Sequence, residues 1–186
     1  MIRKKLIFIV ELILSLRYLP LRLIEIVGQV FPENSNGCAI RGLLYKPFLK
    51  STGRNLQIGL NVKLEHLNNI TIGNDVYIGH GSWISGLRGG IILEDEVMIG
   101  PYVKMVSSNH TFENGSARFA PGIGGEIKIG YGTWIASGVT ITAGVEVGRG
   151  SLLAASTVVT KNIPEDSIAA GIPAIIIGKV SEKYKR

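Results

Sequence analysis

The side chain best suited to acid–base chemistry in this sequence is a histidine in a polar stretch. The chain contains three histidines, His66, His80 and His110. Only His110 lies in a long polar, aromatic and glycine-rich stretch, SSNHTFENGSARFAPGIGGE, where it directly follows Asn109. Because imidazole titrates near neutral pH, it can take a proton from an attacking group and return one to a leaving group. His110 is therefore the candidate general base.

A serine nucleophile is the alternative chemistry in the same stretch. Ser107 and Ser108 lie close to His110 in the sequence, and an activated serine could form an acyl-enzyme. The sequence has no glycine-flanked nucleophile elbow, the strained turn on which such a serine commonly stands. The sequence pattern therefore favours a histidine base over a serine nucleophile in this stretch.

A six-residue repeat predicts the framework that holds these residues. From residue 129 onward, an aliphatic residue recurs at every sixth position, each followed by a small or short residue. A second set, four places after the aliphatic, is small or β-branched: Thr133, Val139, Val145, Ser151 and Thr157. A short strand followed by a bend satisfies this period, and three such units close one triangular coil. The aliphatic series is Ile129, Ile135, Ile141, Val147, Leu153 and Val159.

Earlier aliphatic residues repeat the pattern, so the predicted fold is mainly β: a parallel β-helix over residues 56–168. The earlier series is Ile58, Leu64, Ile72, Ile78, Ile84, Leu93, Ile99 and Met105. Between Met105 and Ile129 lie four periods that lack the pattern, although the register agrees on both sides. We therefore expect residues 106–126 to form a loop that projects from the coil and carries His110. Residues 169–186 are expected to form a C-terminal tail.

The N-terminal segment, residues 1–55, differs in charge and hydrophobicity. The net charge of +6 comes from residues 1–54, which hold nine Lys and Arg against three Glu. The apolar run from Leu6 to Leu16 is too short and too interrupted for a membrane span. We expect an amphipathic helix, broken or bent near Pro20, and two roles remain open. Residues 1–30 could pack on the first coil, or they could contact an anionic membrane surface.

The single cysteine bears on the compartment. Cys38 cannot form an internal disulfide, and a reducing cytoplasm is the simplest location. We expect its thiol to be a small buried side chain.

Three phrases carry a resemblance to a known family: VMIGPYVKMVSSNHTF, IKIGYGTWIASGVTITAGVEVG and VVTKNIPEDSIAAGIPA. Over roughly residues 56–180 the sequence resembles the hexapeptide-repeat acetyltransferases that modify sugars, particularly members of O-antigen and capsule biosynthesis. The resemblance implies a left-handed β-helix and a homotrimer. It also implies acetyl-CoA as donor, bound in a groove between neighbouring subunits, with His110 as the base.

The resemblance also suggests binding residues. It places Trp134 and Ser137 near the thioester, Ala155 along the pantetheine arm, and Thr160 with Lys161 near the nucleotide. Two departures from the family pattern concern the phosphate and the acceptor. Relatives often have a basic residue directly after the AGxPA turn. This chain reads AGIPAIIIGKV there, so its first basic residue after the turn, Lys179, lies several positions further along the chain. Where sugar-acetylating relatives often have an asparagine, this chain has His80, so His80 and Asn109 are the acceptor candidates.

The resulting expectation is acetyl transfer from acetyl-CoA to a sugar hydroxyl in surface-polysaccharide synthesis, with a soluble or lipid-linked glycan as acceptor. The enzyme would be cytoplasmic, with peripheral contact at the inner membrane surface, and without a nucleic-acid partner. Three other functions remain: N-acetylation of an amino-sugar nucleotide, a non-enzymatic β-helical scaffold, and a metal-dependent hydratase resembling the gamma carbonic anhydrases. The last needs three convergent histidines, and the spacing of His66, His80 and His110 lacks the usual close pair.

Overall fold

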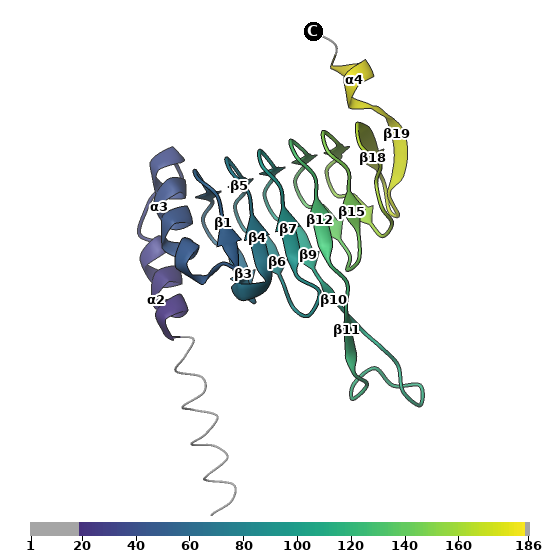
Figure 1. Cartoon of the computed structure of the whole chain (residues 1–186), viewed down its shortest axis with the longest axis horizontal. Coiled ribbons are helices and arrows are strands. Elements are labelled where there is room, and N and C mark those ends of the chain that lie inside the picture. The colour runs from purple at the N-terminus through teal and green to yellow at the C-terminus, as the bar shows by residue number, and fades with distance from the viewer. Residues whose placement is uncertain (1–18, 185–186) are drawn as a thin grey trace, which may run out of the picture.

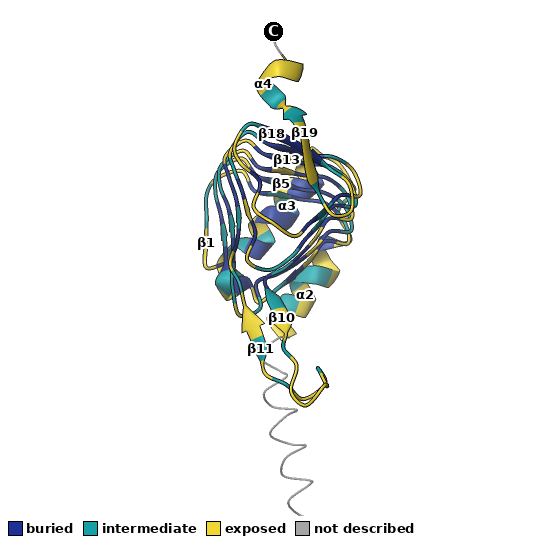
Figure 2. Ribbon diagram, turned by 90° about the vertical axis from the view of Figure 1, so that its right-hand side faces the viewer, coloured by how far each residue is buried: buried dark blue, intermediate teal, exposed yellow. Residues whose placement is uncertain are grey.

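The six-residue period folds into a solenoid of parallel strands. The computed structural model describes residues 19–184, and the main body of the chain winds through three sheets that form the sides of a triangular prism (Figures 1 and 2). Sheet A contains β1 (Ser51–Thr52), β4 (Ile70–Ile72), β7 (Ile91–Leu93), β12 (Ile127–Ile129) and β15 (Glu146–Val147). Sheet C contains β3 (Lys63–Glu65), β6 (Trp83–Ser85), β9 (Lys104–Val106), β14 (Thr140–Ile141) and β17 (Val158–Val159).

Sheet B has seven strands and closes the third side of the prism. Its parallel part contains β2 (Gln57–Ile58), β5 (Tyr77–Ile78), β8 (Met98–Ile99), β13 (Trp134–Ile135), β16 (Leu152–Leu153) and β18 (Ser167–Ala170). The last strand, β19 (Ile175–Lys179), pairs antiparallel with β18 and is followed by α4 (Val180–Lys183). The solenoid therefore begins at β1, slightly before the boundary expected at residue 56.

The interior of the prism confirms the repeat. All the aliphatic residues of the predicted series are at most 2% exposed, and strands one coil apart pair them, as Ile135 with Ile99 and Leu153. The second set is also buried, and two of its hydroxyl groups bond to the next coil: Thr133 Oγ1 donates to Gly148 O at 3.1 Å and Ser151 Oγ to Pro164 O at 3.0 Å. The hydroxyl of Thr157 has no partner among the described residues. Small side chains of this set thus fill the space between aliphatic layers, and those of Thr133 and Ser151 do so with their hydroxyls paired.

The residue after the aliphatic is glycine in several turns, because there the next coil lies directly above it. A Cβ at Gly79 would come within 2.6 Å of the Gly100 carbonyl carbon, and one at Gly148 within 2.3 Å of Glu165 N. Two places further on, the backbone is left-handed, with φ of 65° at Gly81 and 59° at Tyr102. This second turn position was not predicted from the sequence. We name the three turns of a coil by the sheets they join: the A–B, B–C and C–A corners.

Two N-terminal helices close the first end of the solenoid. Helices α2 (Leu19–Gly28) and α3 (Ser35–Tyr45) pack on each other, and α3 lies against β2 of the first coil (Figure 1). The approach is close, because a Cβ at Gly42 would lie 1.8 Å from Leu56 O. A short helix, η1 (Lys46–Phe48), then leads into β1, and another, η2 (Leu67–Asn69), occupies the first C–A corner.

Only part of the predicted N-terminal helix can be compared with the structure. The apolar run Leu6–Leu16 lies outside the described residues. Pro20 stands in the first turn of the described part of α2. Within residues 19–184, no helix combines the length and hydrophobicity needed to cross a bilayer.

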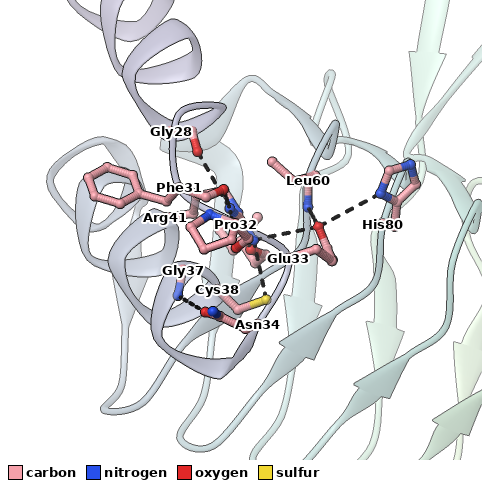
Figure 3. A network of polar contacts seen from close by, with 11 residues as sticks. Gly28, Phe31, Pro32, Glu33, Asn34, Gly37, Cys38, Arg41, Leu60 and His80 are labelled. Atoms are coloured by element: carbon pink, nitrogen blue, oxygen red, sulfur yellow. Dashed lines mark hydrogen bonds and ion pairs between the residues drawn. The ribbon is translucent and has the colours of Figure 1, made fainter.

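A buried arginine joins this helical cap to the first coil (Figure 3). Arg41 is 2% exposed, and its Nε donates to Ile58 O at 2.6 Å while Nη1 donates to Phe31 O at 2.9 Å. Its Nη2 lies 3.3 Å from the sulfur of Cys38, which is buried as predicted. Glu33 extends the network, because its Oε2 lies 3.6 Å from Arg41 Nη2 and accepts a 2.6 Å hydrogen bond from Leu60 N.

Candidate active site

The polar stretch around His110 forms a hairpin that leaves the prism at the third C–A corner. Strands β10 (Ser108–His110) and β11 (Gly122–Gly124) pair antiparallel, with His110 opposite Gly122, and project away from the coils (Figure 1). Beyond the strands, Glu113 and Ser116 exchange two backbone hydrogen bonds of 3.0 Å. The loop predicted at residues 106–126 is therefore present, and it is an ordered hairpin at its base.

The base of this hairpin is fixed by backbone contacts to the coil below. The Ser107 carbonyl accepts hydrogen bonds of 3.1 Å from both Gly89 N and Gly125 N. Glycine is needed at both donors, because a Cβ at Gly89 would lie 2.4 Å from the backbone of Gly125, and a Cβ at Gly125 would lie 2.7 Å from Gly144 N. The Ser107 side chain is fully buried, and its Oγ donates to Leu87 O at 3.0 Å and to Ser85 O at 3.2 Å. Ser107 therefore holds the hairpin and is not available as a nucleophile.

His110 stands on this fixed base with its side chain exposed to solvent. Among residues 19–184, no side chain forms a hydrogen bond with its imidazole, so a substrate can reach it. The opposite residue, Gly122, has no side chain, and a Cβ there would lie 2.8 Å from the guanidinium of Arg88. Arg88 thus lies beside the strand pair that carries His110. Its charge could meet an anionic or hydroxyl-bearing ligand, and the sequence pattern did not single it out.

A groove runs along the outer face of sheet B. Its volume is about 550 Å³, and it continues into the B–C corners. Trp134, Ser137 and Ala155 line it, so three of the five predicted donor-binding residues come together. Apolar residues that the sequence analysis did not propose complete the walls: Tyr77, Met98, Pro101, Leu152 and Tyr184. A groove with apolar walls and a few polar groups suits an extended, mainly aliphatic chain.

The missed wall residues did carry a signal in the sequence. Tyr77, Met98, Trp134 and Leu152 each stand immediately before a core aliphatic residue in sheet B, and each pairs with the next one along the sheet. Side chains at this position point outward, because neighbouring strand residues face opposite sides. An apolar column on an outer face of the prism is therefore a candidate binding surface.

The predicted site residues fall on two different edges of the prism. Ser137 and Ala155 stand in B–C corners, between β13 and β14 and between β16 and β17. Thr160 and Lys161 follow β17, in the last C–A corner, and His110 also leaves from a C–A corner. All five are partly or fully exposed. One chain by itself therefore presents the predicted base on one edge and the groove on another.

The other predicted residues lie apart from this groove. Asn109 is exposed on β10, next to His110. His80 stands in the B–C corner after β5, with Nδ1 3.8 Å from Glu33 Oε2 and its ring edge-on to Tyr102 (Figure 3). His66 occupies the first C–A corner, where Nδ1 lies 3.4 Å from Ser85 Oγ. Lys179 ends β19 and lines a separate pocket of about 280 Å³ at the C-terminal end. The three histidines thus stand in three separate coils.

Comparisons with known proteins agree with this fold. No protein-family model matches the sequence. The chain is 32% identical over 156 residues to a Saccharomyces cerevisiae protein named "Putative acetyltransferase YJL218W", covering 84% of this chain and 72% of the yeast protein. It is 28% identical over 131 residues to the Escherichia coli protein named "Putative lipopolysaccharide biosynthesis O-acetyl transferase WbbJ", covering 70% of this chain and 61% of that protein.

A solved structure shares the whole architecture. A galactoside acetyltransferase in complex with coenzyme A superposes with a TM-score of 0.78 at 25% sequence identity, covering 89% of this chain and 81% of that one. The solenoid and its projecting hairpin define a β-helical acyltransferase. The chain belongs to the hexapeptide-repeat acetyltransferases, whose β-helix is left-handed.

Proposed function

We propose that this protein transfers an acetyl group from acetyl-CoA to a sugar hydroxyl, with His110 as general base. The observation that carries the proposal is the position of His110: an exposed imidazole on a hairpin whose base is fixed by backbone hydrogen bonds. Because the hairpin is fixed where it leaves the prism, the imidazole keeps a constant position relative to the coils. Catalysis by proton transfer requires such a constant position. The same hairpin carries Asn109 as a candidate acceptor contact.

The reaction balances without an acyl-enzyme. His110 takes the proton of the sugar hydroxyl as its oxygen attacks the thioester carbonyl carbon. The carbon–sulfur bond then breaks, and the imidazolium returns the proton to the departing thiolate. The products are the O-acetyl sugar and free coenzyme A, and the neutral imidazole is regenerated.

The groove on sheet B is the proposed donor site. Its apolar column suits the pantetheine arm, with Trp134 and Ser137 near the thioester and Ala155 along the arm. Thr160 and Lys161 are proposed nucleotide contacts, since a lysine ammonium is a suitable partner for phosphate. The complex of the related galactoside acetyltransferase with coenzyme A supports this choice of donor.

The separation of base and groove supports a shared site. His110, Thr160 and Lys161 lie on C–A corners, whereas Trp134, Ser137 and Ala155 line the groove at the B–C edge. A second copy that sets its C–A edge beside this groove would complete the site, and a homotrimer closes such heterologous contacts. The hairpin also exposes Phe112 and Phe119, by 74% and 86%, and a neighbouring copy would cover them.

The similarity to the lipopolysaccharide O-acetyl transferase supports a glycan acceptor of surface-polysaccharide synthesis. We place the enzyme in the cytoplasm, with residues 1–30 as its proposed contact with the inner membrane surface. N-acetylation of an amino-sugar nucleotide is the second candidate, because a solved N-acyltransferase shares this fold with a TM-score of 0.62 at 18% identity. Acetyl-CoA turnover on hydroxyl-bearing and amino-bearing sugars decides between the two.

Replacing the proposed base tests the mechanism. We expect His110→Ala to lower kcat by roughly 10² or more, because proton transfer contributes about that much. The matched control is His66→Asn, since His66 has a φ of 54° and asparagine tolerates this conformation. Normal turnover in a folded His110→Ala variant would contradict the assignment.

A further inference from the structure

Helix α2 carries a row of large apolar side chains that nothing in the described structure covers. Five residues form this row, at positions i, i+4, i+7, i+8 and i+11 of the helix and the turn that follows it. Their exposed fractions are too high for side chains that belong to the core. We call them the α2 stripe: Leu19 (50%), Leu23 (53%), Ile26 (65%), Val27 (48%) and Val30 (80%).

The stripe is not a helix face left open by poor packing, because the opposite face of α2 is well packed. Leu21 packs against the hydrophobic core, and Gly28 is buried with Arg41 Cγ 3.3 Å from where its Cβ would lie. The helix is therefore held in one orientation by its inner face. That orientation turns five apolar side chains outward at the end of the prism, where α2 lies beside α3 (Figure 1).

Charge distinguishes between the surfaces that could cover the stripe. Residues 1–54 hold nine basic residues against three acidic ones, and four of the basic residues, Arg3, Lys4, Lys5 and Arg17, precede the stripe in the chain. Of the acidic residues, Glu25 pairs with Arg22 at 2.6 Å, and Glu33 lies 3.6 Å from Arg41. Contact between two copies would bring like charges together, whereas an anionic lipid surface attracts them.

We propose that the α2 stripe is a membrane-docking surface that binds anionic phospholipid. Its apolar side chains enter the interface between headgroups and acyl chains, and the net positive charge of residues 1–54 attracts the anionic headgroups. Apolar burial and charge attraction act together, as reversible docking of this kind requires. The inference rests on and deepens the proposed membrane contact of residues 1–30, and its consequence is that the hairpin with His110 works close to lipid-linked acceptors.

Threefold symmetry would strengthen the contact. Rotation about one axis keeps three copies of α2 at the same height along that axis, so three stripes can meet one flat surface together. Once one stripe is bound, the other two are held close to the same membrane, so weak single contacts become stable association.

Vesicle binding tests the docking surface without any measurement of catalysis. The probe is the full chain with phosphatidylcholine vesicles, prepared with and without phosphatidylglycerol and sedimented at low and high salt. We expect wild-type protein to sediment with the anionic vesicles and to be released by salt. The double variant Leu23→Glu/Ile26→Glu should partition at least about tenfold more weakly.

A second stripe variant and two controls complete the test. Val30→Glu probes the most exposed residue of the stripe, beyond the end of the helix, and should weaken binding without disturbing the fold. Ile177→Glu makes the same change at a 60% exposed residue of β19 and should bind like wild type. Light scattering should give one mass for all variants, and turnover of a soluble acceptor should stay within about twofold of wild type.

Two outcomes would overturn the proposal. The first is wild-type protein that ignores anionic vesicles, or stripe variants that bind them as well as wild type does. The second is a fall in mass for the stripe variants, which would assign the stripe to contact between copies. Wild-type protein that turns over acetyl-CoA normally but ignores anionic vesicles would overturn the docking surface and leave the proposed acetyl transfer intact. A folded His110→Ala variant with normal turnover would overturn the proposed base and leave the docking surface intact.

Discussion

The guanidinium of Arg41 donates a 2.6 Å hydrogen bond from Nε to the carbonyl oxygen of Ile58, and so joins helix α3 to the first coil of the β-helix. Ile58 lies in β2, which is the edge strand of sheet B within residues 19–184. An exposed edge of this kind invites pairing with other chains. Arg41 meets a carbonyl of the edge, and Glu33 meets the Leu60 N–H. The helical cap thus protects the end of the solenoid.

Removing this contact should destabilise the protein strongly. Arg41→Met keeps much of the side-chain volume but leaves Ile58 O and Phe31 O without their donor and Glu33 without its cation. We expect a loss of about 3 kcal/mol in the free energy of unfolding, measured by urea denaturation at fixed protein concentration. Arg22→Met is the matched control, because Arg22 is 72% exposed in a surface ion pair and should cost less than about 1 kcal/mol. Equal effects in both variants would show that burial of Arg41 contributes nothing.

The groove on sheet B should bind coenzyme A through its aromatic wall. Trp134→Ala removes a 45% exposed indole, and we expect the Kd for coenzyme A to rise by about tenfold, with a smaller change in kcat. Isothermal titration measures the affinity directly. Trp83→Ala offers a control of similar exposure, 40%, on the outer face of sheet C. A Trp83→Ala variant that weakens binding as much as Trp134→Ala would shift the donor site to another face.

A site shared between copies predicts rescue in mixed oligomers. His110→Ala removes the base, and Ala155→Trp blocks the groove at an exposed corner, so each variant alone should be nearly inactive. Co-expressed in equal amounts, they should recover about a quarter of wild-type activity, because that fraction of interfaces pairs an intact base with an intact groove. A site formed within one chain would give no recovery. Native mass spectrometry on the mixture, which resolves the mass difference between the two variant chains, would establish that mixed trimers are present.

The corner carboxylate Asp95 should make stability depend on acid pH. Its pKa lies below the ordinary value, because its oxygens accept hydrogen bonds from the side chain of Asn74 at 3.0 Å and from its backbone N–H at 2.7 Å. A carboxyl with a lower pKa in the folded state stabilises that state above its unfolded pKa of about 3.9 and loses this effect as pH falls through the folded value.

Replacing the Asp95 carboxylate should therefore change the Tm only at pH values where this group is charged in the folded state. Asp95→Asn should lower the Tm at pH 7, and its difference from wild type should shrink between about pH 4 and pH 2. Glu182→Gln on α4 makes the same change of charge at a surface helix and serves as the control. A Tm difference for Asp95→Asn that stays constant with pH would exclude this linkage.

Much of the fold could be predicted because the β-helix repeats a local rule. Core aliphatic residues such as Ile135 recur every six residues, so the spacing alone identifies the positions that face inward. Where glycine follows the aliphatic residue, the next coil leaves no room for a Cβ. The break in the pattern between Met105 and Ile129 likewise predicted the projecting loop that carries His110, and the structure shows that this loop is a hairpin. Local periodicity of this kind is readable because every coil satisfies the same packing condition.

Tertiary structure alone decided which residues lie together. Trp134, Ser137 and Ala155 share a groove, whereas His110, Thr160 and Lys161 stand on another edge of the prism. The edge on which a residue lies depends on how many turns the chain has made before it, and the structure is needed to establish that number. Tyr184 enters the groove from the C-terminal segment, and Arg41 reaches Ile58 across the cap, through contacts that no local pattern encodes. The outward direction of the α2 stripe was likewise settled by how Leu21 and Gly28 pack. Periodicity determines which side chains face inward, but the relative position of distant surfaces depends on the summed geometry of the whole chain.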